Sequence, residues 1–244
     1  MIFGGCSLTN ATQEIDLNCK VHKQMNKGLL IVFEGIDGTG KSTQMSLLAT
    51  ALMEKGFAVV ETREPTNGPF GQQIRALYTH RNGVSREQEL ELFLADRREH
   101  VQNLLVPALQ EGKIVLCDRY FLSTAAYQGT TLGLGEGGSL SSGAISDGFS
   151  PAEIIEKNNF APDPDLALLF CAPPKIGIER ITQGRGETLN DFEQESALNK
   201  VAAIFDRLDL PYIHRVNASG SIESIHQSVL QAVAPLLRTM NHHA

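Results

Sequence analysis

The sequence has no excess of positive charge. Its 21 Lys and Arg residues are outnumbered by 28 Asp and Glu residues, which gives a formal net charge of -7. A surface that binds nucleic acid or an anionic membrane needs a basic face to release counterions, so this balance argues against both partners. We therefore expect any anionic ligand of this chain to bind at one local site.

Cysteine pairs, targeting segments and long apolar runs are also missing. Cys6, Cys19, Cys117 and Cys171 lie far apart and include no C-x-x-C pair, which argues against a structural metal. Residues 1–27 have neither the basic nor the apolar region of a signal peptide. No run approaches the roughly 18 apolar residues of a membrane span. We expect a cytoplasmic protein with reduced thiols.

Short apolar runs alternate with amphipathic segments along most of the chain. The predicted buried strands are 29–34, 58–62, 114–117, 166–171 and 212–216. The predicted helices are 42–55, 70–78, 86–111, 123–127, 151–158, 174–183, 193–208 and 221–238. This alternation predicts right-handed βαβ units, and so one three-layer α/β/α domain over 28–244 with a central five-stranded parallel sheet.

Two segments break this pattern. Residues 1–27 show no clear periodicity and are expected to be a disordered N-terminal extension. Residues 130–150 are rich in Gly and Ser, and such a composition buries too little apolar surface to offset its ordering entropy. We expect a flexible insertion there, in preference to a separate substrate lid.

The first turn of the predicted sheet carries the pattern G-x-x-x-x-G-K-S, directly after a strand and directly before a helix. Glycines allow the backbone to turn tightly and present N–H groups, and the helix N-terminus adds partial positive charge, so the loop can cradle phosphates. Lys41 would reach the β and γ phosphates, and the Ser42 hydroxyl would hold Mg²⁺. A glycine turn with an incidental lysine is the alternative. The predicted site for a nucleoside triphosphate comprises Gly35, Asp37, Gly38, Thr39, Gly40, Lys41, Ser42 and Thr43.

Arginines follow two of the predicted strands. Arg63 comes after the second strand, and Asp118 and Arg119 come after the third. Because ligands of doubly wound sheets bind at the carboxyl ends of the strands, these side chains should converge on one crevice. Phe93 and Arg97, four residues apart, share one helix face beside it. As alternatives, Phe93 is a core residue, Arg97 is a solvated charge and Arg119 pairs with Asp118.

These motifs together resemble the thymidylate kinases of the bacterial type. The matching pieces, in the family's order, are FEGIDGTGKSTQ, TREP, ELFLADRREH, DRYFLSTAAYQG, PDLALLF and RITQGRGE, and the resemblance runs from Leu29 to the C-terminus. It implies a P-loop NTPase fold, a homodimer, and transfer of a phosphoryl group from ATP to dTMP with Mg²⁺. It also implies a LID segment at about 180–192.

The resemblance assigns roles around the phosphates. Asp37 is similar to the acidic residue that helps to place the acceptor nucleotide and the metal. Arg63 and Arg119 are similar to arginines that hold the acceptor phosphate, where a bidentate fork suits an anion. Asp118 takes the position near Mg²⁺, beside Ser42.

Further roles concern the base and the sugar. The resemblance implies that Phe93 stacks on thymine and that Arg97 reaches either the thymine or the phosphate of the nucleotide. Thr124 is similar to a residue that bonds the thymine edge. Tyr127 and Gln128 resemble residues that line the sugar and base, and a tyrosine against C2′ would favour a deoxyribose.

The P-loop of this chain contains no arginine, and family members of that kind place basic residues in the LID. Arg180 and Arg185 are therefore the candidates for stabilising the transferring phosphoryl group, unless they are ordinary loop arginines. One departure is Cys171, where family members usually have an aspartate, so a carboxylate is expected to be missing near the site.

Two rival functions remain open. One is a kinase for another nucleoside monophosphate or for a deoxynucleoside, which would share the P-loop. The other is a nucleotide-binding homologue with weakened or absent catalysis, in which Cys171 would mark the decay. The retained Arg63, Arg97 and Arg119 argue against the second rival, because a switch has no acceptor phosphate to hold.

Overall fold

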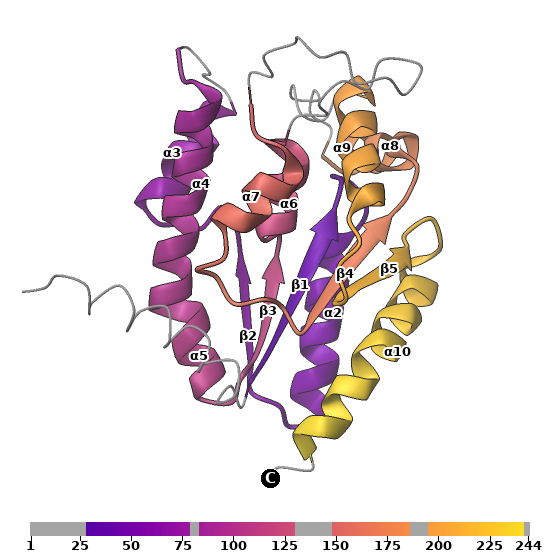
Figure 1. Cartoon of the computed structure of the whole chain (residues 1–244). Helices are drawn as coiled ribbons and strands as arrows, with labels where there is room; N and C mark the ends of the chain where they lie inside the picture. Colours follow the sequence, from indigo (N-terminus) through magenta and orange to yellow (C-terminus); the bar gives the residue numbers. More distant parts are fainter. Residues whose placement is uncertain (1–27, 79–82, 130–147, 186–194, 242–244) are drawn as a thin grey trace, which may run out of the picture.

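A computed structural model describes residues 28–78, 83–129, 148–185 and 195–241 of the chain (Figure 1). The predicted extension 1–27, most of the predicted insertion 130–150 and the predicted LID beyond Arg185 lie outside these residues. In the described ranges no helix is both long enough and apolar enough to cross a bilayer.

The centre of the protein is a parallel sheet of five strands in the order β2-β3-β1-β4-β5. Each predicted strand is confirmed to within one residue at either end. The middle strand β1 is buried along its whole length, as its unbroken apolar run requires of a strand covered on both faces. The strands are β1 (Leu29–Gly35), β2 (Val59–Arg63), β3 (Ile114–Asp118), β4 (Leu166–Cys171) and β5 (Ile213–Asn217).

Helices cover both faces of the sheet, which confirms the three-layer architecture (Figure 1). One core lies between the sheet and helices α2 and α10, and the other lies between the sheet and η1, α5, α6 and α9. The helices are α2 (Lys41–Glu54), α3 (Pro69–Leu77), α4 (Arg86–His100), η1 (Val101–Leu105), α5 (Val106–Gln110), α6 (Phe121–Tyr127), α7 (Pro151–Lys157), α8 (Pro174–Arg185), α9 (Glu195–Arg207) and α10 (Ile222–Asn241).

The long helix predicted for 86–111 is interrupted by a π-helical segment. Helix α4 ends at His100, η1 follows with i to i+5 hydrogen bonding, and α5 completes the rod. The physical reason is Pro107, the second residue of α5: it has no N–H to donate and its ring excludes the carbonyl four residues earlier. A wider turn before the proline accommodates both effects.

The register of the strands brings the predicted motifs to one edge of the sheet. Asp118 of β3 lies opposite Phe33 of β1 and Arg63 of β2. The P-loop leaves β1 at this same edge. Helix α4 starts at a capping box formed by Ser85 and Gln88. It contains Phe93 and Arg97, two of the predicted base-binding residues.

Candidate active site

A crevice of about 780 Å³ lies at the carboxyl ends of the strands. It has a P-loop half, lined by residues 37–44, by Gly220 of the β5–α10 connection and by Ile222 at the start of α10, and an arginine half, lined by residues within 63–78, 93–97 and 124–128. Every predicted site residue lines it except two: Gly35, the last residue of β1, and Arg185, whose side chain falls outside the described part of α8.

Backbone conformation builds the P-loop half. Gly38 and Gly40 have φ values of 77° and 88°, in the left-handed region that favours glycine. A Cβ on Gly38 would also lie 2.1 Å from the carbonyl oxygen of Gly177, so a side chain cannot be accommodated there. The hydroxyl of Thr39 donates to the carbonyl of Ile36 at 2.9 Å and closes the loop on itself. These features give a preformed cradle of backbone groups.

Lys41 is the first residue of α2 and lines this cradle. Its Nζ donates to the carbonyl oxygen of Ile36 at 2.8 Å, and the side chain is buried. Burial, followed by the nearby charge of Arg119, lowers the pKa of Lys41 to about 8. An amine held in this way exchanges a weak carbonyl partner for a phosphate at little reorganisation cost. The lysine is thus built into the crevice, against the alternative of an incidental residue.

A hydroxyl and a carboxylate meet beside the P-loop. The Ser42 hydroxyl donates to Oδ2 of Asp118 at 2.5 Å. The other oxygen, Oδ1, is buried, and no group in the described residues forms a hydrogen bond with it. A buried carboxylate oxygen without a partner is costly unless a ligand satisfies it. These oxygens fit Mg²⁺, which is bound through one or two carboxylates together with phosphate oxygens and waters.

Arg119 joins the two halves of the crevice. Its Nη2 donates to Oδ1 of Asp37 at 2.6 Å, and its guanidinium lies 5.1 Å from the ring centroid of Tyr127. The Tyr127 hydroxyl donates to the other Asp37 oxygen at 3.0 Å. Burial alone would raise the pKa of Asp37, but Arg119, Lys41 and Tyr127 together hold it well below its ordinary value. Arg119 therefore pairs with Asp37, and the alternative pairing with Asp118 is wrong for this structure.

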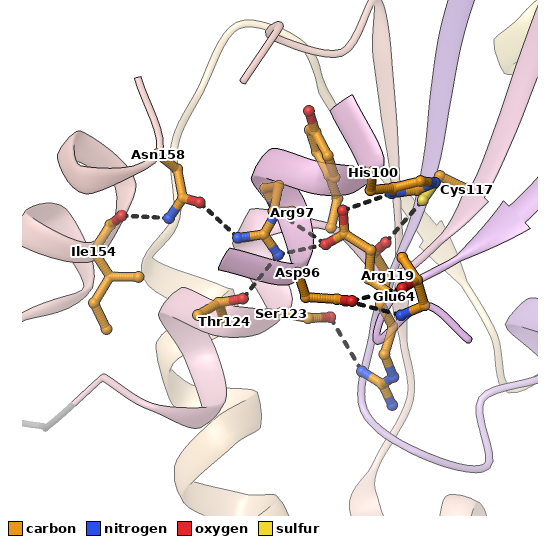
Figure 2. Close-up of polar contacts among 12 residues, drawn as sticks. Glu64, Asp96, Arg97, His100, Cys117, Arg119, Ser123, Thr124, Ile154 and Asn158 are labelled. Carbon is orange, nitrogen blue, oxygen red and sulfur yellow. Dashed lines mark hydrogen bonds and ion pairs between the residues drawn. The ribbon is translucent and has the colours of Figure 1, made fainter. Parts of the chain in front are cut away.

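Arg97 is the centre of a buried polar network in the arginine half (Figure 2). Its Nε and Nη2 donate to Oε2 of Glu64 at 2.9 and 2.5 Å. Nη1 donates to Oδ1 of Asn158 at 2.6 Å, and Nη2 also donates to Thr124 Oγ1 at 3.0 Å. With the side chain 1% exposed, the alternative of a solvated helix charge is wrong.

His100, which is not among the residues that line the crevice, extends this network (Figure 2). Its Nδ1 lies 2.9 Å from Oε1 of Glu64, and its Nε2 lies 2.8 Å from the Thr62 hydroxyl. Burial would raise the pKa of Glu64, but Arg97 and then His100 lower it. Both carboxylate oxygens of Glu64 are thus occupied by charged or polar partners, which leaves Arg97 little freedom to move.

The β2–α3 connection is fastened to α4. Asp96 accepts hydrogen bonds from the backbone N–H and the hydroxyl of Thr66, at 2.8 and 2.6 Å. Arg63 at the end of β2 and Arg75 on α3 both donate to Oδ1 of Asn67, which lies on this connection, at 3.3 and 3.4 Å. Two guanidinium groups therefore converge at the crevice on one neutral acceptor, where an anion would replace a weak partner.

Phe93 and Gln128 both line the crevice. Phe93 is 9% exposed and belongs to the buried set, so it is a core residue that also presents a surface to the crevice. The Gln128 Nε2 donates to Glu89 Oε1 at 3.4 Å. Among the described residues its Oε1 is buried without a hydrogen-bond partner. A carboxylate accepts hydrogen bonds, so it directs the NH₂ group of the amide toward itself and the carbonyl oxygen elsewhere.

Arg180 belongs to the P-loop half. Its Nη1 and Nη2 donate to the carbonyl oxygens of Ala218 and Gly220, at 2.9 and 3.3 Å. Gln44 Nε2, on α2, donates to the carbonyl of Ile222, the first residue of α10, at 2.8 Å. These side chains hold the β5–α10 connection over the P-loop.

Cys171 lies outside the crevice, which corrects the expectation that a carboxylate is missing near the site. Side chains alternate along β4, so Leu169 and Cys171 point to the α9 side while Phe170 packs on the α2 side. The thiol lies 3.9 Å from Nη1 of Arg215 in a separate cavity against α9. Burial raises its pKa.

Several residues of the site were not predicted. Glu64 and His100 stood inside the motifs TREP and ELFLADRREH, so their position signalled involvement although their pairing did not. The sequence signal that could have identified Arg75 was its position on the helix that follows the second strand. Asn158 had no signal, because it directly follows α7 and meets Arg97 through the tertiary fold alone.

Comparisons with known proteins agree with one family. The family model described as thymidylate kinase matches residues 33–229. A thymidylate kinase of Desulfotalea psychrophila is 53% identical over 213 residues, which cover 87% of this chain and 98% of the relative. A thymidylate kinase of Xanthomonas euvesicatoria pv. vesicatoria is 43% identical over 215 residues, covering 86% and 87%. One of Xanthomonas oryzae pv. oryzae is 41% identical over 215 residues, covering 86% of each.

Proposed function

The chain belongs to the thymidylate kinase family, and from this premise we propose that it transfers the γ-phosphoryl group of ATP to dTMP, giving dTDP and ADP. The observation that carries the proposal is a single crevice with two unlike halves. A glycine cradle suits the phosphates of ATP, and a buried guanidinium beside an aromatic ring and an amide suits a pyrimidine nucleotide.

For the thymine base we propose Phe93, Arg97 and Gln128. A guanidinium has five N–H donors, and four of those of Arg97 are used by Glu64, Asn158 and Thr124. The N–H on Nη1 to which the described residues offer no acceptor suits a single base carbonyl and not a phosphate, which would need a free fork. This count favours thymine as its target. The free Gln128 Oε1 would accept the N–H at position 3, and Phe93 would stack on the ring.

For the acceptor phosphate we propose Arg63 and Arg119, with Arg75 as an additional ligand. All three line the crevice, and Arg63 and Arg75 share the neutral side chain of Asn67 as an acceptor. Tyr127, fixed by its hydrogen bond to Asp37, would pack against the deoxyribose and leave no room for a 2′-hydroxyl. Thr124, expected at the thymine edge, would act mainly by holding Arg97.

For the donor we propose the P-loop amides of Gly38, Thr39, Gly40 and Thr43 with Lys41, whose Nζ would move from the Ile36 carbonyl to the β and γ phosphates. Ser42 and Asp118 would hold Mg²⁺, which when bound neutralises phosphate charge and orients the γ phosphate. Asp37 would keep Arg119 directed toward the space between the nucleotides. No covalent intermediate is needed, because positioning and charge stabilisation supply the catalysis.

For the LID we propose a division of labour between its arginines. Arg180 donates to the carbonyls of the β5–α10 connection, so it would arrange the donor end of the crevice. Arg185 ends α8 one turn and a half further along and would supply the charge that stabilises the transferring phosphoryl group. The predicted roles of both arginines in catalysis remain predictions.

At the level of the whole molecule, we propose that residues 28–244 act as one kinase domain, with a LID at about 180–192 and an insertion at about 130–150. We propose that it works as a cytoplasmic homodimer. These proposals rest on the resemblance to the family, and light scattering coupled to gel filtration tests the oligomeric state.

The decisive experiment is an ADP-release assay with ATP, Mg²⁺ and an acceptor panel of dTMP, dUMP, dCMP, AMP and thymidine. We expect dTMP to give the highest kcat/KM. A preference for another acceptor would replace this function by that of a different nucleotide kinase. Binding of both ATP and dTMP by calorimetry, with no dTDP formed, would establish a non-catalytic homologue.

A further inference from the structure

Glu34 is a fully buried carboxylate that does not line the crevice. It lies on the central strand β1, one residue before the P-loop begins, and its side chain is 0% exposed. Burial raises its pKa to about 7, although the hydrogen bond from Ser123 and the charge of Arg119 act in the opposite direction. An acidic residue at such a position is costly for the fold, and its partners indicate what it does there.

The first partner of Glu34 is the backbone next to Arg119. The N–H of Tyr120 donates to Oε1 of Glu34 at 3.0 Å, and the N–H of Arg119 donates to the carbonyl of Phe33 at 2.9 Å. Among the described residues, Arg119 is the only non-glycine residue with a positive φ, at 69°. A left-handed conformation is unfavourable for arginine and persists only where its surroundings impose it. Here both N–H groups around the turn are tied to β1, one of them by Glu34.

The second partner of Glu34 is Ser123, which together with Asp37 holds the Arg119 guanidinium. The Ser123 hydroxyl donates its proton to Oε2 of Glu34. Its oxygen is therefore left to accept from Nη1 of Arg119, at 3.1 Å. A hydroxyl has one proton, so the carboxylate decides which way the serine points. Because the Ser123 hydroxyl directs its O–H toward Glu34, the lone pairs of its oxygen face the Arg119 guanidinium.

We propose that Glu34 is a positioning residue that sets both the backbone turn and the guanidinium direction of Arg119. This inference rests on the proposed function, in which Arg119 holds the acceptor phosphate. Glu34 itself is not among the residues that line the crevice. Its removal would loosen Arg119 and weaken dTMP binding, while the P-loop that receives ATP keeps its own hydrogen bonds.

A double-mutant cycle on dTMP binding tests the coupling. Calorimetry without ATP gives the Kd of dTMP for the wild type, Glu34→Gln, Arg119→Ala and the double variant. We expect Glu34→Gln to raise the Kd about tenfold in the wild type and less than about twofold when Arg119 is already absent. An equal effect in both backgrounds would overturn the inference, since Glu34 would then act by some route other than Arg119.

The same variants separate positioning from general loss of structure. In Glu34→Gln we expect the KM of ATP to stay within about twofold of the wild type while the KM of dTMP rises. If Glu34→Gln does not fold, Ser123→Ala takes its place in the cycle, because it removes the bridge and leaves the carboxylate. Additive effects of Ser123→Ala and Arg119→Ala would contradict the proposed bridge.

Failure of the proposed function gives a different result. In that case wild-type protein forms no dTDP from ATP and dTMP, whatever residue 34 is. An active wild type with an additive cycle would reject only the role of Glu34.

Discussion

The P-loop half and the arginine half of the crevice are built on different principles. The P-loop half consists mostly of consecutive residues whose backbone turns through left-handed glycines, and its lysine rests on a carbonyl of the same loop. In the arginine half, Glu64, Arg97, Thr124 and Asn158 come from four separate parts of the chain and meet in one buried network. The first half is local and the second depends on the complete fold.

This difference has energetic consequences. When a P-loop loses a ligand-binding side chain such as Lys41, activity falls. The conformation of the loop is kept, because backbone groups and glycines determine it. In a buried network every member satisfies another, so the loss of one leaves uncompensated polar groups. Substitutions in the P-loop half should therefore impair activity alone, and substitutions in the arginine half should impair activity and stability together.

The largest expected effect is that of Lys41→Ala. Loss of the charge at the β and γ phosphates should lower kcat by about 10³-fold, with little change in thermal unfolding because the loop is closed by Thr39 and the glycines. The coupled ADP-release assay and circular dichroism measure the two quantities. Lys200→Ala, on the exposed surface of α9, is the matched control. Near-normal turnover of Lys41→Ala would remove the lysine from the mechanism.

The next largest effect is expected for Arg97→Lys. A lysine keeps the charge but cannot bond Glu64, Asn158 and Thr124 in the same plane, so we expect the KM of dTMP to rise about 10²-fold. The free energy of unfolding should fall by about 3 kcal/mol, as for other broken buried pairs. Chemical denaturation measures this loss. A stable variant with normal dTMP kinetics would show that activity and stability are not coupled in the arginine half.

A smaller effect is expected for Phe93→Ala. Loss of the ring should raise the KM of dTMP about tenfold through lost stacking and leave the KM of ATP within about twofold. Phe93 also belongs to the core, so a modest loss of stability should accompany this change. Steady-state kinetics with each nucleotide varied in turn gives both constants. Equal increases in the two KM values would contradict a stacking role confined to the arginine half.

The smallest effect is expected from pH, which tests whether a titration in the P-loop half leaves the arginine half unaffected. The pKa of Lys41 lies at about 8, below its ordinary value, so the amine loses its charge as pH rises through 8. We expect kcat/KM for ATP to fall about fourfold by pH 8.5. The Kd of dTMP in the absence of ATP should not follow this titration, because Lys41 belongs to the other half. A parallel decline of both constants would argue against that separation.

The sequence allowed a good prediction of everything that depends on local order. The five apolar runs mark the five strands, and the parallel order follows from their alternation with helices. Because strand ends share one edge, the positions of Arg63 and Arg119 were also predictable. The P-loop was the easiest part, since its function resides in consecutive residues.

Features that depend on distant packing escaped prediction. Asn158 bonds Arg97 only because α7 folds back onto α4 and α6, and nothing in its local sequence indicates this. Helix position alone allows Arg97 to be either a ligand contact or a solvated charge, and it does not reveal the buried network of which Arg97 is the centre. The position of Cys171 depends on which face of β4 it occupies, and a continuous apolar strand does not reveal its faces.

The π segment at 101–105 sets the rotation of α5 relative to α4 about their common axis. A π turn holds one more residue than an α turn, so it shifts the angular phase of the rod by one residue step, or about 100°. Phe93 and Arg97 before it can thus face the crevice while Leu105 and Leu109 beyond it face the sheet. Deleting a single residue there would remove this phase shift and rotate one of these two faces out of place, so the length of this rod is constrained as well as its composition.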